Sequence, residues 1–278
     1  MSRFFEDADT AKNYLRYRPG YSNEVVDTMI SFLAAKRAGP YELALDVGCG
    51  SGQLTRSLST HFARVIGLDI SEAQIDAAQT VPNPQNVSFS KALCPIVIVT
   101  CRVGRAENLP AADASVDIIT SATASHYFNW DIFGKEVERV LKPNGCLVAL
   151  SYDFFYIEHQ DEGVAKKLAE CIESHMDYIT NSELRKSTPE DYLTYRDQYK
   201  ECLPLSYTDQ ERIDMTMNKT MNLREFIEFH KTWANFIKLH NEDPDATLAH
   251  FEKKNLMNIR PLRGLIDSKI KEFIRNCI

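Results

Sequence analysis

The pattern of apolar and polar residues in the first half of the chain predicts strands and helices that follow one another along the sequence. Short apolar runs at Leu43–Val47 and Val65–Leu68 are typical of buried strands. Ahead of them, apolar residues recur at helical spacing, as at Val26, Met29 and Leu33. Such an alternation predicts an α/β fold, with a doubly wound, mainly parallel sheet and helices on both of its faces.

The same patterning locates the other expected elements. It predicts helices over residues 8–17, 23–35, 72–79 and 131–140, and further strands over 87–89, 115–120 and 146–152. In the second half, residues 162–178, 189–199, 223–239 and 267–278 have helical patterns, whereas 212–218 alternate like a strand. No seventh strand is recognisable after residue 260. We therefore expect an N-terminal helical cap (1–40), a ligand-binding core (41–152) and a helical C-terminal lid and lobe (153–278).

One apolar stretch interrupts this order. Residues 90–101 include Ile96–Val99, which is strongly strand-forming. Joining Phe89 directly to Arg102 would give a short strand that leads straight into residues 104–107. We therefore expect residues 90–101 to be an insertion, because crossover connections are normally short.

Three glycines at alternate positions follow the first predicted strand. Gly48, Gly50 and Gly52 let the chain turn sharply and bring bare backbone close to a ligand. Cys49 lies within this turn, where a small residue is needed, so we interpret it as a structural residue and not as a nucleophile. The residues that follow, 53–58, have the pattern of a first helical turn. A strand, a glycine turn and a helix N-terminus form a site for a nucleotide-like ligand.

Two acids flank this turn. Asp69 ends the second predicted strand, where an acid can accept hydrogen bonds from ribose hydroxyls. Ser71 is the better cap for the next helix, which leaves Asp69 available for a ligand. Asp46 precedes Gly48 by two positions, where it would repel a pyrophosphate but suit an ammonium and a sulfonium. With the Gly-x-Gly-x-Gly spacing, this favours S-adenosylmethionine over the nicotinamide of a dehydrogenase.

The motifs resemble those of class I S-adenosylmethionine-dependent methyltransferases. Residues 45–52 and 65–71 resemble the first two motifs, 104–110 the adenine loop, 115–119 the fourth strand and 141–147 the turn into the fifth. The resemblance covers about residues 10–152 and implies a Rossmann-like core. Residues 14–21 and 231–233 are similar to the trans-aconitate methyltransferase-like group. The expected cofactor-binding residues are Asp46, Gly48, Cys49, Gly50, Gly52, Asp69, Ile70, Ala106, Glu107 and Ser121. Tyr14, Tyr17 and Arg18 are candidates to close the methionine end of the cofactor, or else they pack as part of a surface helix.

The resemblance implies O-methylation of a small, carboxylate-bearing metabolite. A carboxylate is already ionised and needs no general base, so alignment for in-line transfer would suffice. An alcohol or phenol would need a base, and His126 is then the candidate; otherwise its imidazole packs or positions the acceptor. Tyr127 and Trp130 are candidates to line the acceptor pocket, and Trp233 is a third, although its helical spacing with Phe229 and Phe236 favours packing.

Composition narrows the alternatives. A net charge of −7 argues against a nucleic-acid partner, and the longest apolar run, 93–99, is too short to span a membrane. Seven scattered cysteines favour reduced thiols and a cytoplasmic location. No His, Asp or Glu cluster has metal-ligand spacing, so we expect no metal. We expect a monomer or a weak homodimer. The alternative function is a catalytically silent, cofactor- or partner-binding protein of methyltransferase type.

Overall fold

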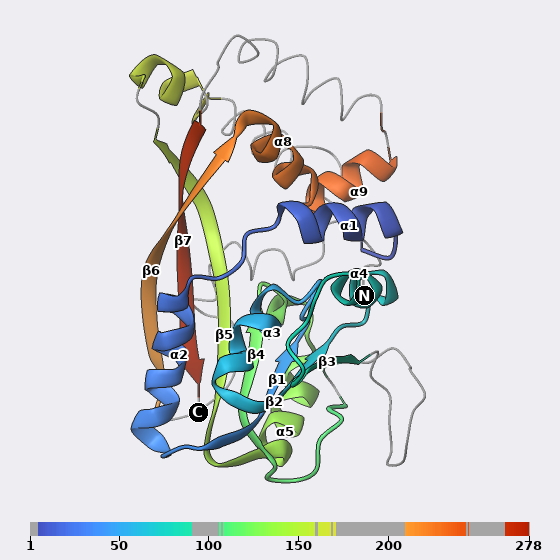
Figure 1. The fold of residues 1–278 in the computed structure, drawn as a ribbon, viewed down its shortest axis with the longest axis vertical. Coiled ribbons are helices and arrows are strands. Elements are labelled where there is room, and N and C mark those ends of the chain that lie inside the picture. Colours follow the sequence, from blue (N-terminus) through green and yellow to red (C-terminus); the bar gives the residue numbers. More distant parts are fainter. Residues whose placement is uncertain are drawn as a thin grey trace.

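The computed structural model contains one seven-stranded sheet (Figure 1). It describes residues 5–90, 106, 108–158, 161–167, 169–170, 209–242, 244 and 265–277. The strand order is β3-β2-β1-β4-β5-β7-β6. The strands are β1 (Tyr41–Val47), β2 (Phe62–Leu68), β3 (Val87–Ser90), β4 (Val116–Ala122), β5 (Leu141–Glu158), β6 (Glu211–Asn222) and β7 (Leu265–Cys277). The first five pair in parallel, which confirms the predicted doubly wound α/β fold.

Helices cover both faces of this sheet because neighbouring residues of each strand point to opposite sides. Leu43 and Leu45 of β1 pack in one core with Phe133 of α5. Ala44, between them, packs in the second core with Met29 of α2. The helices ahead of β5 are α1 (Ala8–Tyr17), α2 (Asn23–Lys36), α3 (Gln53–Ser57), α4 (Glu72–Gln79) and α5 (Trp130–Val140), with 3₁₀ turns η1 (Leu58–Thr60) and η2 (Ser125–Tyr127).

Side-chain caps fix where several helices begin. The side chains of Asp7, Ser22 and Ser71 accept hydrogen bonds from backbone N–H groups in the first turns of α1, α2 and α4. Such caps satisfy donors that have no partner within the helix. The predicted role of Ser71 as the cap of α4 is therefore confirmed.

The predicted continuous helix over residues 223–239 is wrong, because the chain forms two helices there. These are α8 (Leu223–Lys231) and α9 (Ala234–Glu242), and Asn222 caps α8 in a capping box with Glu225. The break follows from Thr232, whose hydroxyl donates to the Phe229 carbonyl at 2.5 Å while its N–H donates to the same oxygen at 3.0 Å. These i→i−3 bonds tighten and end the last turn of α8.

The C-terminal expectation is also wrong: residues 265–277 form the strand β7 and not a helix. β7 lies between β5 and β6 and is antiparallel to both, so the sheet does have a seventh strand. The ladders on both sides of β7 supply hydrogen-bond partners for most of its backbone groups, which outweighs the helical spacing of the apolar residues. β6 contains the strand predicted at 212–218.

The boundary predicted at residue 152 between the core and the C-terminal lobe does not coincide with the end of a strand in the structure. β5 continues past residue 152 to Glu158, and β6 and β7 of the expected C-terminal lobe belong to the core sheet. Residues 162–167 are helical, but most of the helix expected over 162–178, and all of that expected over 189–199, lie outside the described residues. Of the expected insertion at 90–101, only Ser90 is described, as the end of β3.

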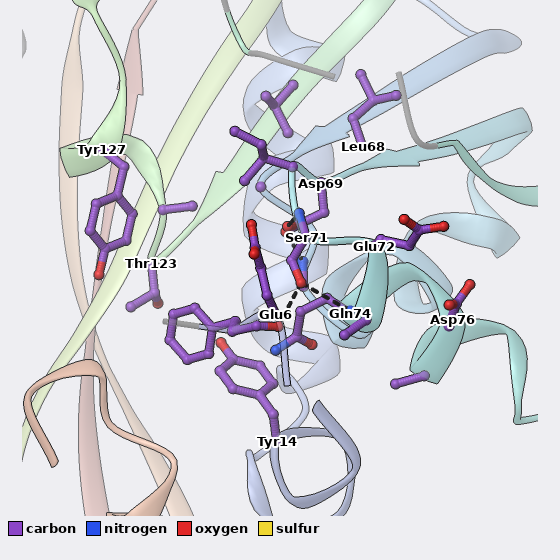
Figure 2. A pocket seen from close by; sticks show the side chains of 18 of the residues that line it. Glu6, Tyr14, Leu68, Asp69, Ser71, Glu72, Gln74, Asp76, Thr123 and Tyr127 are labelled. Atoms are coloured by element: carbon purple, nitrogen blue, oxygen red, sulfur yellow. Dashed lines mark hydrogen bonds between the residues drawn. The ribbon is translucent and has the colours of Figure 1, made fainter. Parts of the chain in front are cut away.

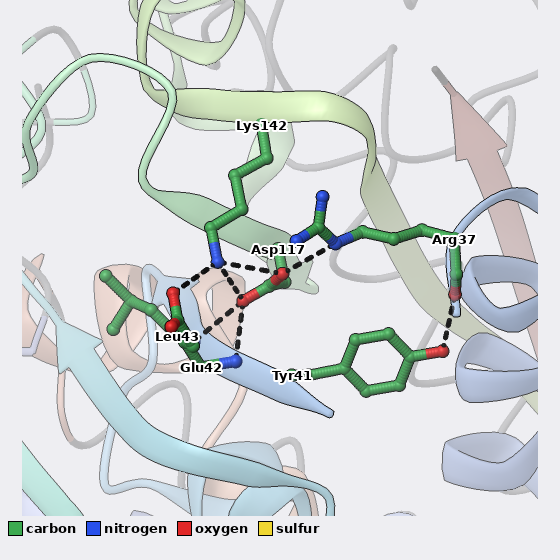
Figure 3. A network of polar contacts seen from close by, with 6 residues as sticks. All are labelled: Arg37, Tyr41, Glu42, Leu43, Asp117 and Lys142. Atoms are coloured by element: carbon green, nitrogen blue, oxygen red, sulfur yellow. Dashed lines mark hydrogen bonds and ion pairs between the residues drawn. The ribbon is translucent and has the colours of Figure 1, made fainter. Parts of the chain in front are cut away.

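Asp117 ties together the amino-terminal ends of β1 and β4 (Figure 3). Its buried carboxylate accepts hydrogen bonds from the backbone N–H groups of Glu42 at 2.8 Å and Leu43 at 2.9 Å. Lys142 and Arg37 each approach it to 3.1 Å. Burial alone would raise the pKa of Asp117, but the hydrogen bonds from Leu43, Glu42 and Lys142 outweigh it and lower the pKa. The predicted structural role of Asp117 is confirmed, and its network braces the sheet at the edge opposite the glycine turn.

Candidate active site

The glycine turn leaves β1 in a backbone conformation that favours glycine. Gly48, Gly50 and Gly52 have φ angles of +72°, +53° and +83°. The N–H groups of Gly48 and Cys49 donate to the Leu68 carbonyl at the end of β2, at 2.7 and 2.9 Å. These bonds hold the turn against the neighbouring strand, at the carboxyl edge of the sheet where ligands bind in this class of fold.

Space as well as conformation requires glycine in this turn. A Cβ atom added to Gly48 would lie 2.4 Å from the Cβ of Ala124, in the loop after β4. A Cβ on Gly50 would lie 3.3 Å from the Tyr14 ring of α1. Two loops and a helix therefore converge on bare backbone, as in a cradle for a ligand. Cys49 is buried, and burial raises the pKa of its thiol, so it stays protonated.

Asp69 stands directly beside this turn. One carboxylate oxygen accepts the Gly50 N–H at 2.7 Å and the other accepts the Ser71 N–H at 2.8 Å. Burial raises the pKa of Asp69, while these hydrogen bonds work against the rise. Each carboxylate oxygen has a second lone pair, so Asp69 can still accept hydrogen bonds from a bound ligand.

Asp46 lies deeper than the sequence suggested. It is fully buried, and its two oxygens accept hydrogen bonds from the hydroxyls of Thr55 at 2.6 Å and Thr120 at 2.8 Å. Burial raises the pKa of Asp46 to about 6. The carboxyl group thus joins β1 to α3 and β4 underneath the glycine turn, and it does not line the cavity described next.

A cavity of about 1210 Å³ opens above the turn (Figure 2). This volume is large enough for a nucleoside cofactor. The cavity brings together six of the residues predicted for the site: Gly48, Gly50, Asp69, Ile70, Ala106 and Tyr127. Eight other described candidates, besides Asp46, are not among its lining residues: Cys49, Gly52, Ser121, Tyr17, Arg18, His126, Trp130 and Trp233. Glu107 lies outside the described residues.

The segment that leads into α1, together with α1 itself, covers this cavity. It contributes Phe5, which was not predicted, and Tyr14, which was a candidate to close the methionine end. The Phe5 carbonyl accepts the Ser71 hydroxyl at 2.6 Å, which ties the segment before α1 to the start of α4. The Phe5 and Tyr14 rings meet edge to face at 5.4 Å. Burial raises the pKa of Tyr14, so its hydroxyl stays protonated. Glu6 and Gln74 are further lining residues, and no glycine or strand-end motif marks them in the sequence.

Arg18 follows α1 and lies behind Tyr14. Its guanidinium carbon is 4.8 Å from the centre of the Tyr14 ring and 5.7 Å from that of Tyr152. It donates hydrogen bonds to the Tyr152 hydroxyl and, at 3.1 Å, to the Thr232 carbonyl. Tyr152 lies just beyond the end of β4 on β5, so Arg18 connects α1 to the carboxyl edge of the sheet and to the end of α8.

His126 is buried in η2, and its ring centre is 4.0 Å from that of Tyr127. Burial lowers the pKa of His126 to about 3. The imidazole is therefore neutral near pH 7 and is a much weaker base than an exposed histidine.

The two tryptophans predicted for the acceptor pocket pack within the protein. Trp130 donates its indole N–H to the Ser125 carbonyl at 3.1 Å, and its ring meets Phe133 at 5.3 Å. Trp233 is buried, with its ring centre 4.4 Å from that of His230.

The loop that carries Ala106 is held by a pair of side chains on α5. Arg139 donates to the carbonyl oxygens of Leu109 at 3.0 Å and Ala111 at 2.8 Å. Glu136 accepts the Leu109 N–H at 2.8 Å and pairs with Arg139 at 2.7 Å. Charge pairing with Glu136 raises the pKa of Arg139, which stays protonated. This clamp positions the loop next to the apolar wall of the cavity.

The described part of the chain contains neither a cluster of metal-binding side chains nor a membrane-spanning helix. No group of three or more His, Cys, Asp or Glu side chains there could hold a metal ion. None of the helices in that part is long and apolar enough to cross a membrane.

The chain was compared with known proteins. A family model described as a methyltransferase domain matches residues 45–149. A Dictyostelium discoideum protein described as a methyltransferase is 30% identical over 236 residues, covering 84% of this chain and 79% of that protein. The Saccharomyces cerevisiae protein CRG1, described as S-adenosylmethionine-dependent, is 26% identical over 164 residues, covering 57% and 48%. A solved structure from Anaeromyxobacter dehalogenans, described as a type II methyltransferase, aligns with a TM-score of 0.66 at 22% identity, covering 94% and 97%.

The residues of the cavity fit S-adenosylmethionine. The glycine cradle admits a ligand close to the backbone, Asp69 offers acceptors for hydroxyls, and Ile70, Ala106 and Phe128 offer an apolar wall. Fold and site together define a class I S-adenosylmethionine-dependent methyltransferase. The chain belongs to the methyltransferase family, as the extended similarity to the Dictyostelium protein shows. When bound, S-adenosylmethionine supplies an electrophilic methyl group on a sulfonium.

Proposed function

We propose that the chain methylates a carboxylate oxygen of a small-molecule acceptor. The product of this transfer is a neutral methyl ester, and the sulfur departs as a neutral thioether, so no proton has to be removed. Three features support the proposal: the resemblance of residues 14–21 and 231–233 to the trans-aconitate methyltransferase-like group, the position of Arg18, and the low pKa of His126.

The position of Arg18 is the observation that carries the proposal. The guanidinium lies against aromatic rings from α1, β5 and α8, at 4.8 Å from Tyr14, 5.7 Å from Tyr152 and 5.4 Å from Phe229. Arginine keeps its charge in such surroundings and presents a planar fork of donors that matches a carboxylate. It donates to Tyr152, just beyond the carboxyl end of β4, and contacts the ring of Tyr14, which lines the cavity. The acceptor carboxylate is therefore proposed to bind on this side of the cavity.

The state of His126 favours the same class of acceptor. Its low pKa makes it a poor base, so it is badly suited to deprotonating an alcohol or a phenol. A carboxylate needs no such base, because it is ionised at neutral pH.

The test is a screen of mono-, di- and tricarboxylic acids with methyl-labelled S-adenosylmethionine. We expect labelled products that release methanol in mild alkali, as methyl esters do and as ethers and N-methyl compounds do not. Arg18→Gln should raise the KM for the acceptor about 10- to 100-fold, because a hydrogen bond between two charged groups is lost. Arg18→Lys, which keeps the charge, should recover part of that loss.

Arg16→Gln is the matched control, since Arg16 lies in α1 and is exposed, with its guanidinium 5.3 Å from the Tyr17 ring. Calorimetric binding of S-adenosylhomocysteine separates effects on the cofactor site from effects on the acceptor. Alkali-stable products alone, or equal effects of the two glutamine variants on KM, would overturn the proposal.

A further inference from the structure

Gln74 places a buried oxygen without a partner in the wall of the cofactor cavity. Its side chain is only 2% exposed, and its Oε1 atom accepts no hydrogen bond from the described residues. Gln74 occupies the first turn of α4, where its backbone N–H donates to the Ser71 hydroxyl at 3.2 Å. Buried carbonyl oxygens are almost always hydrogen-bonded in folded proteins, so this one calls for a donor from outside the described chain.

The oxygen lies beside the glycine turn and the strand-end acid. A Cβ atom built on Gly50 would be 3.9 Å from Gln74 Oε1, and the Gly50 N–H donates to Asp69 at 2.7 Å. The Gln74 oxygen and the Asp69 carboxylate therefore lie close to the same glycine. Figure 2 shows the Gln74 side chain between Ser71 and Tyr14, and all three residues line the cavity.

The chemistry of these two side chains suits a pair of hydroxyls. Both oxygens of Asp69 already accept a backbone N–H, from Gly50 and from Ser71, so part of their capacity is used. A ribose presents two adjacent hydroxyls, each with one proton to donate. A neutral carboxamide oxygen matches a neutral hydroxyl, whereas an ammonium group would favour the charged Asp69.

We infer that Gln74 accepts a hydrogen bond from a ribose hydroxyl of S-adenosylmethionine, so that Asp69 and Gln74 bind the ribose diol together. The inference concerns the cofactor and does not depend on the proposed acceptor. It makes Gln74 a cofactor-binding residue, and it explains why an oxygen is buried at this position of α4.

The test is calorimetric titration with S-adenosylhomocysteine and with its 2′-deoxy and 3′-deoxy analogues. Gln74→Met keeps a similar length but removes the acceptor, and we expect it to weaken binding of S-adenosylhomocysteine about tenfold. Removing the hydroxyl that Gln74 binds should weaken binding to the wild type by a similar factor. For that analogue, Gln74→Met should cause little further loss, because both changes remove the same bond.

Gln79→Met is the matched control: the same substitution in the same helix, at an exposed position that does not line the cavity. It should bind all three ligands as the wild type does, and thermal unfolding verifies that both variants are folded. Wild-type affinity of Gln74→Met for S-adenosylhomocysteine would overturn the inference. An equal loss for all three ligands would also overturn it, because it would show that Gln74 acts elsewhere than on the ribose.

Discussion

Asp46 shows how a single buried carboxyl group links the site to stability. Burial removes water from this group, and the hydrogen bonds that it accepts from Thr55 and Thr120 do not offset that loss, so its pKa rises to about 6. In the unfolded chain the pKa returns to about 3.9. The folded state therefore binds the proton more tightly, and this contribution to stability is fully present below pH 4 and is lost as the pH rises through 6.

We predict that Asp46→Asn removes this pH dependence. As the pH rises from about 4 to about 7, the wild type should lose up to ~3 kcal/mol of its free energy of unfolding through Asp46, as two pKa units imply. The variant should not lose this contribution, so its free energy of unfolding should rise by that amount relative to the wild type. Urea unfolding at several pH values measures the difference. Asp27→Asn, at an exposed position of α2, is the control. A difference between Asp46→Asn and wild type that stays constant over this range would contradict the raised pKa.

Individual residues also show what the sequence could and could not reveal. The positions of Gly48, Gly50 and Asp69 in the site follow from local motifs, because a glycine turn and a strand end are features of neighbouring residues. The partners of Asp46 could not be read in this way, since Thr120 is 74 positions away. Gln74 looks like an ordinary residue of a helix start, and only the arrangement of α4 against the glycine turn gives it a possible ligand.

At the scale of elements, α1 is the cover of the site. It packs between α4 and α8 over the cavity (Figure 1), and Tyr14 closes against Gly50. Arg18 ties its end to Tyr152 and Thr232. We expect a cofactor that contacts Phe5 and Tyr14 to stabilise this packed position of α1, so that cofactor binding and the closure of α1 are coupled.

We predict that S-adenosylhomocysteine slows amide hydrogen exchange in α1. A ligand that binds only the closed form at 100 times its Kd stabilises that form by about 2.7 kcal/mol, which allows up to about hundredfold slower exchange through local opening. Mass spectrometry after short labelling times measures this effect. α2 is the internal control, because it packs on the sheet away from the cavity and its local exchange should change little. Unchanged exchange in α1 at saturation would contradict the role of α1 as the cover.

Helices and strands differ in how well the local sequence pattern predicts their type and bounds. The expected bounds of α1 and α4 are confirmed, because a capping residue and helical spacing agree there. β7 was mistaken for a helix because Ile266, Ile270, Phe273 and Ile274 recur at a spacing of three and four. Its strand conformation depends on pairing with β5 and β6, which lie more than 40 residues away along the chain. The local sequence of β7 does not reveal these partners.

At the scale of the whole molecule, β7 joins the last strand of the sheet to the cofactor site. Among the described strands, β6 pairs with β7 alone, and β7 pairs with β5 over Leu147–Glu158. β5 in turn lies beside β4 and accepts, at the Leu150 carbonyl, the Thr123 N–H from the cavity loop at 2.7 Å. Disturbing β7 should therefore affect both stability and the site.

We predict that Ile274→Pro lowers the free energy of unfolding by ~3 kcal/mol or more and weakens S-adenosylhomocysteine binding. Ile274 pairs with Leu150 on one side and Ile213 on the other, so whichever strand its N–H faces, proline removes a ladder hydrogen bond from the interior of the sheet. Urea unfolding and calorimetry measure the two effects. Ile274→Val, which keeps the N–H and a β-branched side chain, is the control and should lose little of either. If the proline variant unfolded at the same urea concentration as the valine variant, β7 could not be the central strand that holds β6 to the methyltransferase core.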